Sequence, residues 1–418
     1  MGQGGFCPLP GNGGIPENLL LLDIYMHLSH LSLKDFRNYK QLDLSLGPGL
    51  FLFQGENAQG KTNLLEAVAM LATSNSFHAT SDREIVNWHA SDRITRIAAS
   101  VERHNDKVKI EIVLIDPTPQ VNGASGDGGS KFIAPNDRQR KHIKINSVPK
   151  KGMDLIGLVT VVLFSPNDLS LVDGSPEERR RFLDRGLCQM QPHYCQALLK
   201  YRKIVAQRSA LLKRIRENQE DPRMLDYLDE KLTELATMIT FERRRMIVSL
   251  NQHVDELQAI ISGGREHLKI VYRPSFHIDP AWDTMETLQN FRIQLNEARR
   301  KEIHQGVCLL GPHRDDLEFL VNDVNMLTYG SRGQQRTSAL AAKLGELAYM
   351  RAVTGEEPIL LLDDVFSELD PLRREHLLRE VLRHEQVLIT ATDFESFPEE
   401  ILAKAHRYLV VDGEILRR

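Results

Sequence analysis

The stretch Gly55-Glu-Asn-Ala-Gln-Gly-Lys-Thr62 decides the fold, because it matches the phosphate-loop pattern G-x-x-x-x-G-K-[ST]. The apolar residues 50–53 before it are typical of a buried strand, and residues 63–73 after it have the pattern of a helix. A strand, a glycine-bearing loop and a helix in this order are the context that a phosphate loop requires. The sequence therefore predicts an α/β domain that binds a nucleotide.

Each part of this loop has a task in holding phosphate. Its glycines let backbone N–H groups surround the phosphates, and the start of the following helix favours negative charge. We expect the Lys61 ammonium to reach the β- and γ-phosphates and the Thr62 hydroxyl to coordinate Mg²⁺. The predicted nucleotide-binding residues are Gly55, Glu56, Asn57, Ala58, Gln59, Gly60, Lys61 and Thr62.

A second motif, Pro-Ile-Leu-Leu-Leu-Asp-Asp over residues 358–364, is an apolar strand that ends in two carboxylates. Ligands of parallel sheets bind at the carboxyl ends of the strands. Asp363 suits Mg²⁺, and Asp364 is the candidate that orients or activates the attacking water. The alternative interpretation is a strand capped by solvated acids.

A third motif, Ser-Arg-Gly-Gln-Gln over residues 331–335, stands at the start of a helix predicted over residues 334–351. A hydroxyl and a glycine lie where backbone N–H groups point outward, which indicates a second anion site. Two helix starts directed at phosphate are more than one nucleotide requires. The candidate residues here are Ser331, Gly333 and Gln334.

Hydrophobic patterning divides the chain into two α/β portions separated by a helical one. Strand patterns precede residue 165, helix dominates residues 176–262 and strands alternate with helices again beyond residue 311. The helical segment is expected as a subdomain, and a longer coiled-coil arm is the alternative. The predicted divisions are a flexible extension (1–25), the N-terminal part of the ATPase domain (26–175) with a mobile loop over 116–137, a helical arm (176–305) and the C-terminal part of the ATPase domain (306–418).

These motifs, followed by Ser-Glu-Leu-Asp over residues 367–370, resemble the ABC-type ATPases, and among them the chromosome-maintenance branch with a helical insertion. The resemblance is closest to the RecF family of bacterial recombination mediators. It rests further on residues 33–39 (Leu-Lys-Asp-Phe-Arg-Asn-Tyr), 165–176, 311–316 (Gly-Pro-His-Arg-Asp-Asp) and 330–337. It implies an ABC-type P-loop ATPase domain assembled from N- and C-terminal parts around an inserted helical arm.

The resemblance also implies a function. Residues 55–62 of one subunit would hold ATP while Ser331 and Gly333 of a second copy cap its γ-phosphate, so that ATP closes a homodimer. Family members bind DNA in an ATP-dependent manner and release it after slow, weak hydrolysis. They act in DNA replication, recombinational repair and the SOS response, and with RecO and RecR they help load RecA at gaps. The implied partners include duplex DNA and junctions of single- and double-stranded DNA.

Two positions depart from the wider class. Many ABC-type ATPases have glutamate where this chain has Asp364, and a histidine in the region of residues 390–393 (Thr-Ala-Thr-Asp). Aspartate is one methylene shorter, so the water is held less well and slow turnover is expected. Residues 1–25 match nothing in the family.

A basic cluster is the candidate DNA surface. Formal net charge is −4, yet residues 179–216 contain eleven basic side chains and one acid, Asp184. Contacts to phosphate supply most sequence-independent affinity for DNA, although charge on long helices also serves merely as a solvated face. The predicted DNA contacts are Arg179, Arg180, Lys200, Arg202 and Lys203.

Other classes fit the sequence less well. The four cysteines form no CxxC pair, and no apolar run is long enough to span a membrane, so a cytoplasmic protein is expected. His313, Asp315 and Asp316 lack a further spaced ligand, which favours a structural or interface role over a metal site. A transporter subunit would keep the phosphate loop and the acidic strand closer together. An ATP-driven scaffold that recruits partners without gripping DNA stays open as an alternative.

Overall fold

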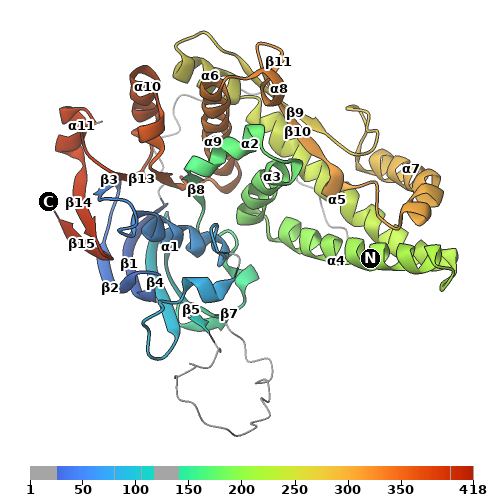
Figure 1. Cartoon of the computed structure of the whole chain (residues 1–418), viewed down its shortest axis with the longest axis horizontal. Coiled ribbons are helices and arrows are strands. Elements are labelled where there is room, and N and C mark those ends of the chain that lie inside the picture. Colours follow the sequence, from blue (N-terminus) through green and yellow to red (C-terminus); the bar gives the residue numbers. More distant parts are fainter. Residues whose placement is uncertain (1–25, 80, 105, 117–140, 396, 418) are drawn as a thin grey trace, which may run out of the picture.

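The computed structural model of the chain describes residues 26–79, 81–104, 106–116, 141–395 and 397–417. The predicted extension (1–25) and nearly all of the predicted loop (116–137) lie outside these residues. Figure 1 shows strands and their covering helices in one half of the molecule and the long helices in the other.

A six-stranded sheet combines strands from before and after the helical half of the chain. Its order is β15-β14-β3-β13-β12-β8, and all neighbours pair in parallel except β15. β3 and β8 precede the helical half in sequence, and the other strands follow it, so the two predicted α/β portions form one domain built from N- and C-terminal parts. The strands are β3 (Gly49–Gln54), β8 (Val161–Phe164), β12 (Ile359–Asp363), β13 (Gln386–Ala391), β14 (His406–Val411) and β15 (Glu414–Arg417).

A second, antiparallel sheet packs beside the first with helix α1 (Lys61–Thr73) between them. Its order is β2-β1-β4-β5-β6-β7. Alternate residues of β1 are buried because a strand turns successive side chains to opposite faces. They join Phe51, Phe53 and the apolar side chains of α1 in one core. The strands are β1 (Met26–Phe36), β2 (Tyr39–Ser45), β4 (Ile94–Arg103), β5 (Asp106–Ile115), β6 (Lys141–Ile145) and β7 (Val148–Lys150).

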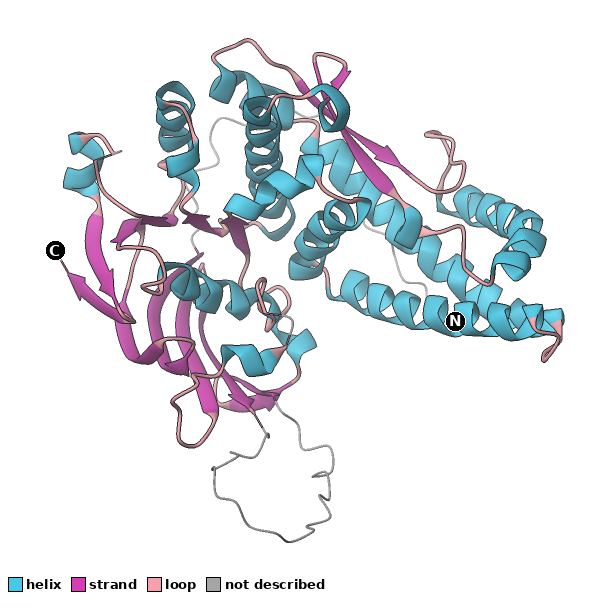
Figure 2. Cartoon of the chain, in the orientation of Figure 1, coloured by secondary structure: helices cyan, strands magenta, loops and turns pink. Residues whose placement is uncertain are grey.

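The other half of the molecule consists mainly of helices, drawn in cyan in Figure 2. Helices α4 and α5 lie side by side and α7 packs on both. One face of α5 is buried and includes Leu225, Leu232 and Ile239. A fully buried ion pair of 2.7 Å between Arg208 and Glu302 connects α4 to α7. The helices are α3 (Pro176–Met190), α4 (Pro192–Arg216), α5 (Leu225–Leu250), α6 (Val254–Ser262) and α7 (Thr284–Gln305).

A three-stranded sheet beside the helices was not fully predicted from the sequence. β9 pairs with β10, and β10 with β11, all antiparallel. β9 lies within the predicted arm, whereas β10 and β11 lie beyond residue 305, so the sheet crosses the predicted boundary. The bounds are β9 (Leu268–Arg273), β10 (Asp316–Val321), β11 (Val324–Asn325), α2 (Ser170–Asp173), α8 (Met326–Tyr329), α9 (Arg332–Thr354), α10 (Pro371–Val381) and α11 (Glu399–Lys404).

The segment Gly-Pro-His-Arg-Asp-Asp over residues 311–316 ties these elements together. The buried Arg243 guanidinium donates to Asp184 Oδ1 at 2.8 Å and to the Pro312 carbonyl at 2.7 Å. Asp315 is fully buried and accepts a 2.8 Å hydrogen bond from the Ser275 N–H. His313 Nδ1 lies 2.6 Å from the Tyr201 hydroxyl. These contacts are structural, which agrees with the role that the sequence favoured for this segment.

Candidate nucleotide site

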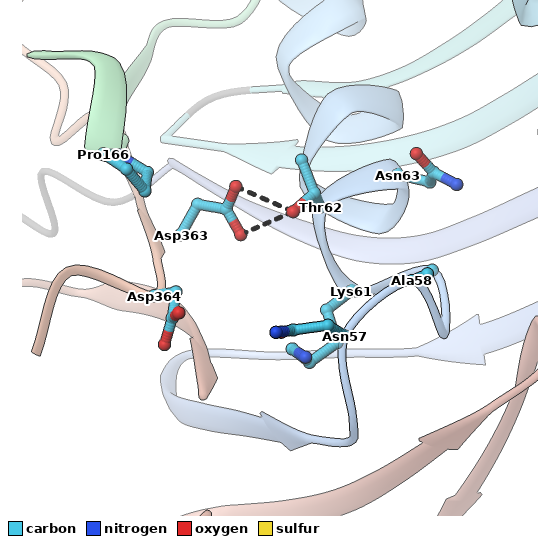
Figure 3. Close-up of a pocket in the computed structure, with 9 residues that line it drawn as sticks. Asn57, Ala58, Lys61, Thr62, Asn63, Pro166, Asp363 and Asp364 are labelled. Atoms are coloured by element: carbon cyan, nitrogen blue, oxygen red, sulfur yellow. Dashed lines mark hydrogen bonds between the residues drawn. The ribbon is translucent and has the colours of Figure 1, made fainter. Parts of the chain in front are cut away.

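The phosphate loop and the acidic end of β12 line one pocket. Strand β3 delivers the loop to the amino end of α1, and β12 ends beside it in the same sheet. The side chains of Lys61, Asp363 and Asp364 are directed into the space between them (Figure 3). The pocket measures about 220 Å³ and is lined by Asn57, Ala58, Gly60, Lys61, Thr62, Asn63, Pro166, Asp363 and Asp364.

Lys61 is held against its own loop. Its ammonium donates to the Gly55 carbonyl at 2.6 Å and to the Glu56 carbonyl at 2.8 Å. Burial lowers the pKa of Lys61, and the carboxylates of Asp364 and Asp363 act in the opposite direction. The ammonium therefore lies inside the loop, in a site whose acids favour its charged form.

Thr62 and Asp363 meet across 301 positions of sequence. The Thr62 hydroxyl lies 2.9 Å from Oδ1 and 2.8 Å from Oδ2 of Asp363 (Figure 3). A hydroxyl and a carboxylate present oxygen ligands only, which is the donor set that Mg²⁺ prefers. The two residues predicted to hold Mg²⁺ are thus adjacent and fit that ion.

Asp364 has an unusual backbone. Its φ of 50° lies in the left-handed region, and its N–H donates to the Thr390 carbonyl at 3.2 Å. This conformation is uncommon for residues other than glycine, although aspartate tolerates it better than most. Because the backbone turns directly after Asp363, Asp364 does not continue the direction of β12. The two acids therefore enter the pocket from different angles.

The turn between β1 and β2 supports the phosphate loop, a contact that the sequence did not predict. Asn38 donates to the Gln59 carbonyl at 2.9 Å, and the Tyr39 hydroxyl donates to the Gly60 carbonyl at 3.0 Å. Gly60 has a φ of 112°, and a Cβ there would lie 2.6 Å from the Asn38 amide nitrogen. Asn63, at the start of α1, also donates to Asn38 at 2.8 Å. The resemblance over residues 33–39 was the available signal.

The serine-glycine-glutamine motif lies away from this pocket. Ser331 is the N-cap of α9, and its hydroxyl accepts from the Gln334 N–H at 3.3 Å while the Gln334 side chain accepts from the Ser331 N–H at 3.1 Å. This reciprocal pair is a capping box. Ser331 is exposed, and neither it nor Gly333 lines the pocket of its own chain.

The candidate DNA contacts divide by exposure. Lys200, Arg202 and Lys203 are exposed on α4, although Arg202 also lies 3.3 Å from an Asp184 oxygen. Arg179 is 2% exposed and pairs with Asp316 at 2.6 Å, so its burial corrects the expectation that it contacts DNA. Arg180 is partly buried and donates to the Asp315 carbonyl at 2.7 Å.

Comparison with known proteins identifies the family to which this chain belongs. The model of the RecF/RecN/SMC N terminal domain matches residues 27–410. The DNA replication and repair protein RecF of Chloroflexus aurantiacus is 44% identical over 401 residues, which cover 93% of this chain and 99% of that protein. The chain belongs to the RecF family. A second RecF-family relative, from Halalkalibacterium halodurans, is 39% identical over 394 residues, 94% of this chain and 100% of that protein.

Solved structures agree with the RecF-family fold. The structure described as the recombination mediator protein RecF-ATPrS in the RecFOR pathway superposes with a TM-score of 0.81 at 30% identity, covering 94% of this chain and 98% of that one. The Smc head domain of Pyrococcus furiosus shares the fold with a TM-score of 0.52 at 14% identity, covering 94% of this chain and 96% of that one. The predicted ABC-type ATPase fold and the resemblance to the RecF family are therefore confirmed.

The described part of this RecF-family chain contains no helix with the length and apolar character needed to cross a bilayer.

Proposed function

We propose that this RecF-family protein is a cytoplasmic, ATP-driven DNA clamp that acts in DNA replication, recombinational repair and the SOS response. The observation that carries the proposal is the convergence of Lys61, Thr62, Asp363 and Asp364 in one pocket. The RecF structures described with ATPrS and with ATP have the same fold and support ATP as the nucleotide. Hydrolysis is weak and serves to switch the state of the protein.

Each pocket residue has a task in this proposal. Lys61 and the loop N–H groups hold the phosphates, and Thr62 and Asp363 hold Mg²⁺, which when bound neutralises phosphate charge. Asp364 accepts a proton from the attacking water or orients that water toward the γ-phosphate.

The position of the serine-glycine-glutamine motif supports an ATP-closed homodimer. Ser331 and Gly333 are absent from the lining of their own chain's pocket, so a second copy would supply them to the γ-phosphate. The N-terminus of α9, a helix of 23 residues, favours an anion. Leu327 and Tyr329 lie just before it and are 48% and 76% exposed, which gives the contact apolar surface to bury.

Sedimentation of the purified protein tests the dimer. We expect a monomer without nucleotide and a dimer with ATP and Mg²⁺ that carries labelled duplex DNA. Ser331→Arg is expected to bind ATP like the wild type and to stay monomeric. The arginine side chain is larger than serine and charged, so it would occupy the space in which the nucleotide of the second copy has to lie. ATP-dependent dimers in this variant would remove the motif from the interface.

A matched control separates two effects of this substitution, the large side chain at the proposed interface and the loss of a helix N-cap. Ser81 is also an exposed N-cap serine with a capping box. It precedes the short 3₁₀ helix Asp82–Ile85, in the half of the molecule that contains the antiparallel sheet. Ser81→Arg is expected to dimerise as the wild type does. If the wild-type protein bound nucleotide but stayed monomeric in every condition, the result would instead indicate that it works in a heteromeric complex.

DNA is expected to bind the exposed cations of α4. Reversal of Lys200, Arg202 and Lys203 to glutamate should make the slope of log K against log salt less negative by ~0.9 for each phosphate contact removed, and weaken ATP-dependent binding by ~10²-fold near 0.1 M salt. Fluorescence anisotropy of labelled duplex DNA measures both quantities.

The control for this variant carries the same change in net charge elsewhere. Arg379, Arg383 and Lys404 are exposed on α10, just beyond it, and on α11. Their reversal to glutamate should leave the affinity and the salt slope close to those of the wild type. Equal losses in both variants, or none in the α4 variant, would mean that α4 is the wrong surface.

RecO and RecR are proposed as the partners with which the DNA-bound dimer helps load RecA, because the RecF structure is described in the RecFOR pathway. An ATP-driven scaffold that recruits these partners without gripping DNA is the second candidate. The scaffold would be favoured if the α4 variant recruited RecO and RecR equally well at all salt concentrations and if its complex with them carried as much DNA as the wild-type complex.

A further inference from the structure

A single buried side chain at the end of β13 contacts both acids of the nucleotide site. Thr390 is fully buried and stands opposite Asp363 in the register of β13 and β12. Its hydroxyl lies 2.8 Å from Asp363 Oδ1. It also accepts a hydrogen bond of 3.0 Å from the Asp364 N–H. Thr390 does not line the pocket, so it acts on the site only through these acids.

The hydroxyl has one proton, and its surroundings decide where that proton goes. The available acceptors are Asp363 Oδ1 at 2.8 Å and the Leu362 carbonyl at 3.4 Å. The shorter contact to an ionised carboxylate is the stronger hydrogen bond. Donation to Oδ1 restricts rotation of the carboxylate, whose Oδ1 and Oδ2 lie 2.9 Å and 2.8 Å from the hydroxyl of Thr62, the other residue proposed to hold Mg²⁺.

The same hydroxyl also stabilises the turn that follows Asp363. The Asp364 N–H is shared between the hydroxyl and the carbonyl of Thr390, and Asp364 has its φ of 50° at this point. A residue in the left-handed region persists where surrounding contacts hold it. Thr390 thereby links the orientation of the metal ligand to the backbone of the candidate base.

We propose that Thr390 is a positioning residue that orients the Asp363 carboxylate for Mg²⁺ through its hydroxyl and holds the Asp364 backbone in its turn. The inference rests on the proposed function of this pocket. Because partners behind a metal ligand typically contribute ~10- to 100-fold to metal affinity, the effect is measurable.

The test is binding of a fluorescent ATP analogue at rising Mg²⁺ concentration, with EDTA as the metal-free reference. Thr390→Val removes the hydroxyl and keeps the shape. We expect it to raise the Mg²⁺ concentration for half-maximal tight binding ~10- to 100-fold, with unchanged affinity in EDTA. Thr390→Ser should restore the wild-type Mg²⁺ requirement, because serine retains the hydroxyl.

Thr160 supplies a matched control. It is a buried threonine immediately before β8 of the same sheet, and its hydroxyl makes no hydrogen bond within the described residues. Thr160→Val should leave the Mg²⁺ requirement unchanged. An equal requirement in Thr390→Val and the wild type, or a serine variant that behaves like valine, would overturn the inference.

Two further outcomes are separable. If Thr390→Val misfolds, Thr390→Ala and Thr390→Ser carry the same comparison, since both lack the methyl group and only serine keeps the hydroxyl. Equal Mg²⁺ requirements in that pair would overturn the inference. A wild-type protein that does not bind the analogue at any Mg²⁺ concentration would instead refute the proposed function, and one that binds without dependence on Mg²⁺ would refute the positioning role.

Discussion

Lys61→Met is expected to abolish measurable nucleotide binding. Methionine keeps the apolar length of the side chain but cannot donate to phosphate. Hydrogen bonds to charged groups contribute about 1.5–3 kcal/mol each, so the loss of two, to the β- and γ-phosphates, weakens binding by ~10²- to 10⁴-fold. Isothermal calorimetry with ATP and Mg²⁺ measures the change, and circular dichroism verifies the fold.

The fold is expected to survive this substitution because the Lys61 ammonium bonds within its own loop. It donates to the carbonyls of Gly55 and Glu56, a few positions earlier in the chain. A matched control is Lys141→Met, since Lys141 likewise donates to a backbone carbonyl, that of Ser74, at 2.6 Å. It should bind ATP as the wild type does. Unchanged ATP affinity in Lys61→Met would contradict the assignment of the phosphate loop.

Asp364→Asn is expected to bind ATP and retain it. The amide is nearly isosteric with the carboxylate but cannot accept a proton from water. Removal of a general base typically slows a reaction ~10²- to 10⁴-fold, so ATP should persist in the dimer and the DNA should stay bound. Single-turnover hydrolysis and the lifetime of the ATP-dependent dimer by sedimentation report the two effects separately.

The backbone at this position allows the substitution. Asparagine adopts the left-handed region about as readily as aspartate, so the φ of 50° adds no new strain. Asp323→Asn is the control: Asp323 is exposed in the turn between β10 and β11 with a φ of 64°. It should hydrolyse ATP at the wild-type rate. Wild-type turnover in Asp364→Asn would mean that another group positions the water.

Local patterns predicted the elements that build the site. Residues 55–62 have their spacing because backbone N–H groups must surround phosphate, and this requirement acts within eight consecutive positions. The apolar run before Asp363 likewise marks a buried strand, and its carboxyl end is where ligands of such sheets bind. The basic count of residues 179–216 was less informative, because it did not separate buried Arg179 from exposed Lys200.

The supporting side chains were not predictable in this way. Asn38 reaches the phosphate loop because the β1–β2 turn folds over it, and Thr390 reaches Asp363 because β12 and β13 pair in one register. Thr390 belongs to no local pattern with a chemical requirement, and the resemblance over residues 33–39 did not indicate which group Asn38 contacts. β9 was missed for a related reason, since its partner β10 lies beyond α7 in the chain.

The sequence by itself determined the phosphate-loop pattern, the two α/β portions with helices between them and the resemblance to the RecF family, because each depends on short stretches with fixed spacing. The tertiary structure alone decided which groups meet. Thr62 and Asp363 lie 301 positions apart and come within 2.8 Å because β3 and β12 belong to one sheet, to which residues 165–358 contribute no strand. It also decided which charges are buried, since Arg179 and Arg202 are of the same residue type and only the packing between elements makes the first buried and the second exposed.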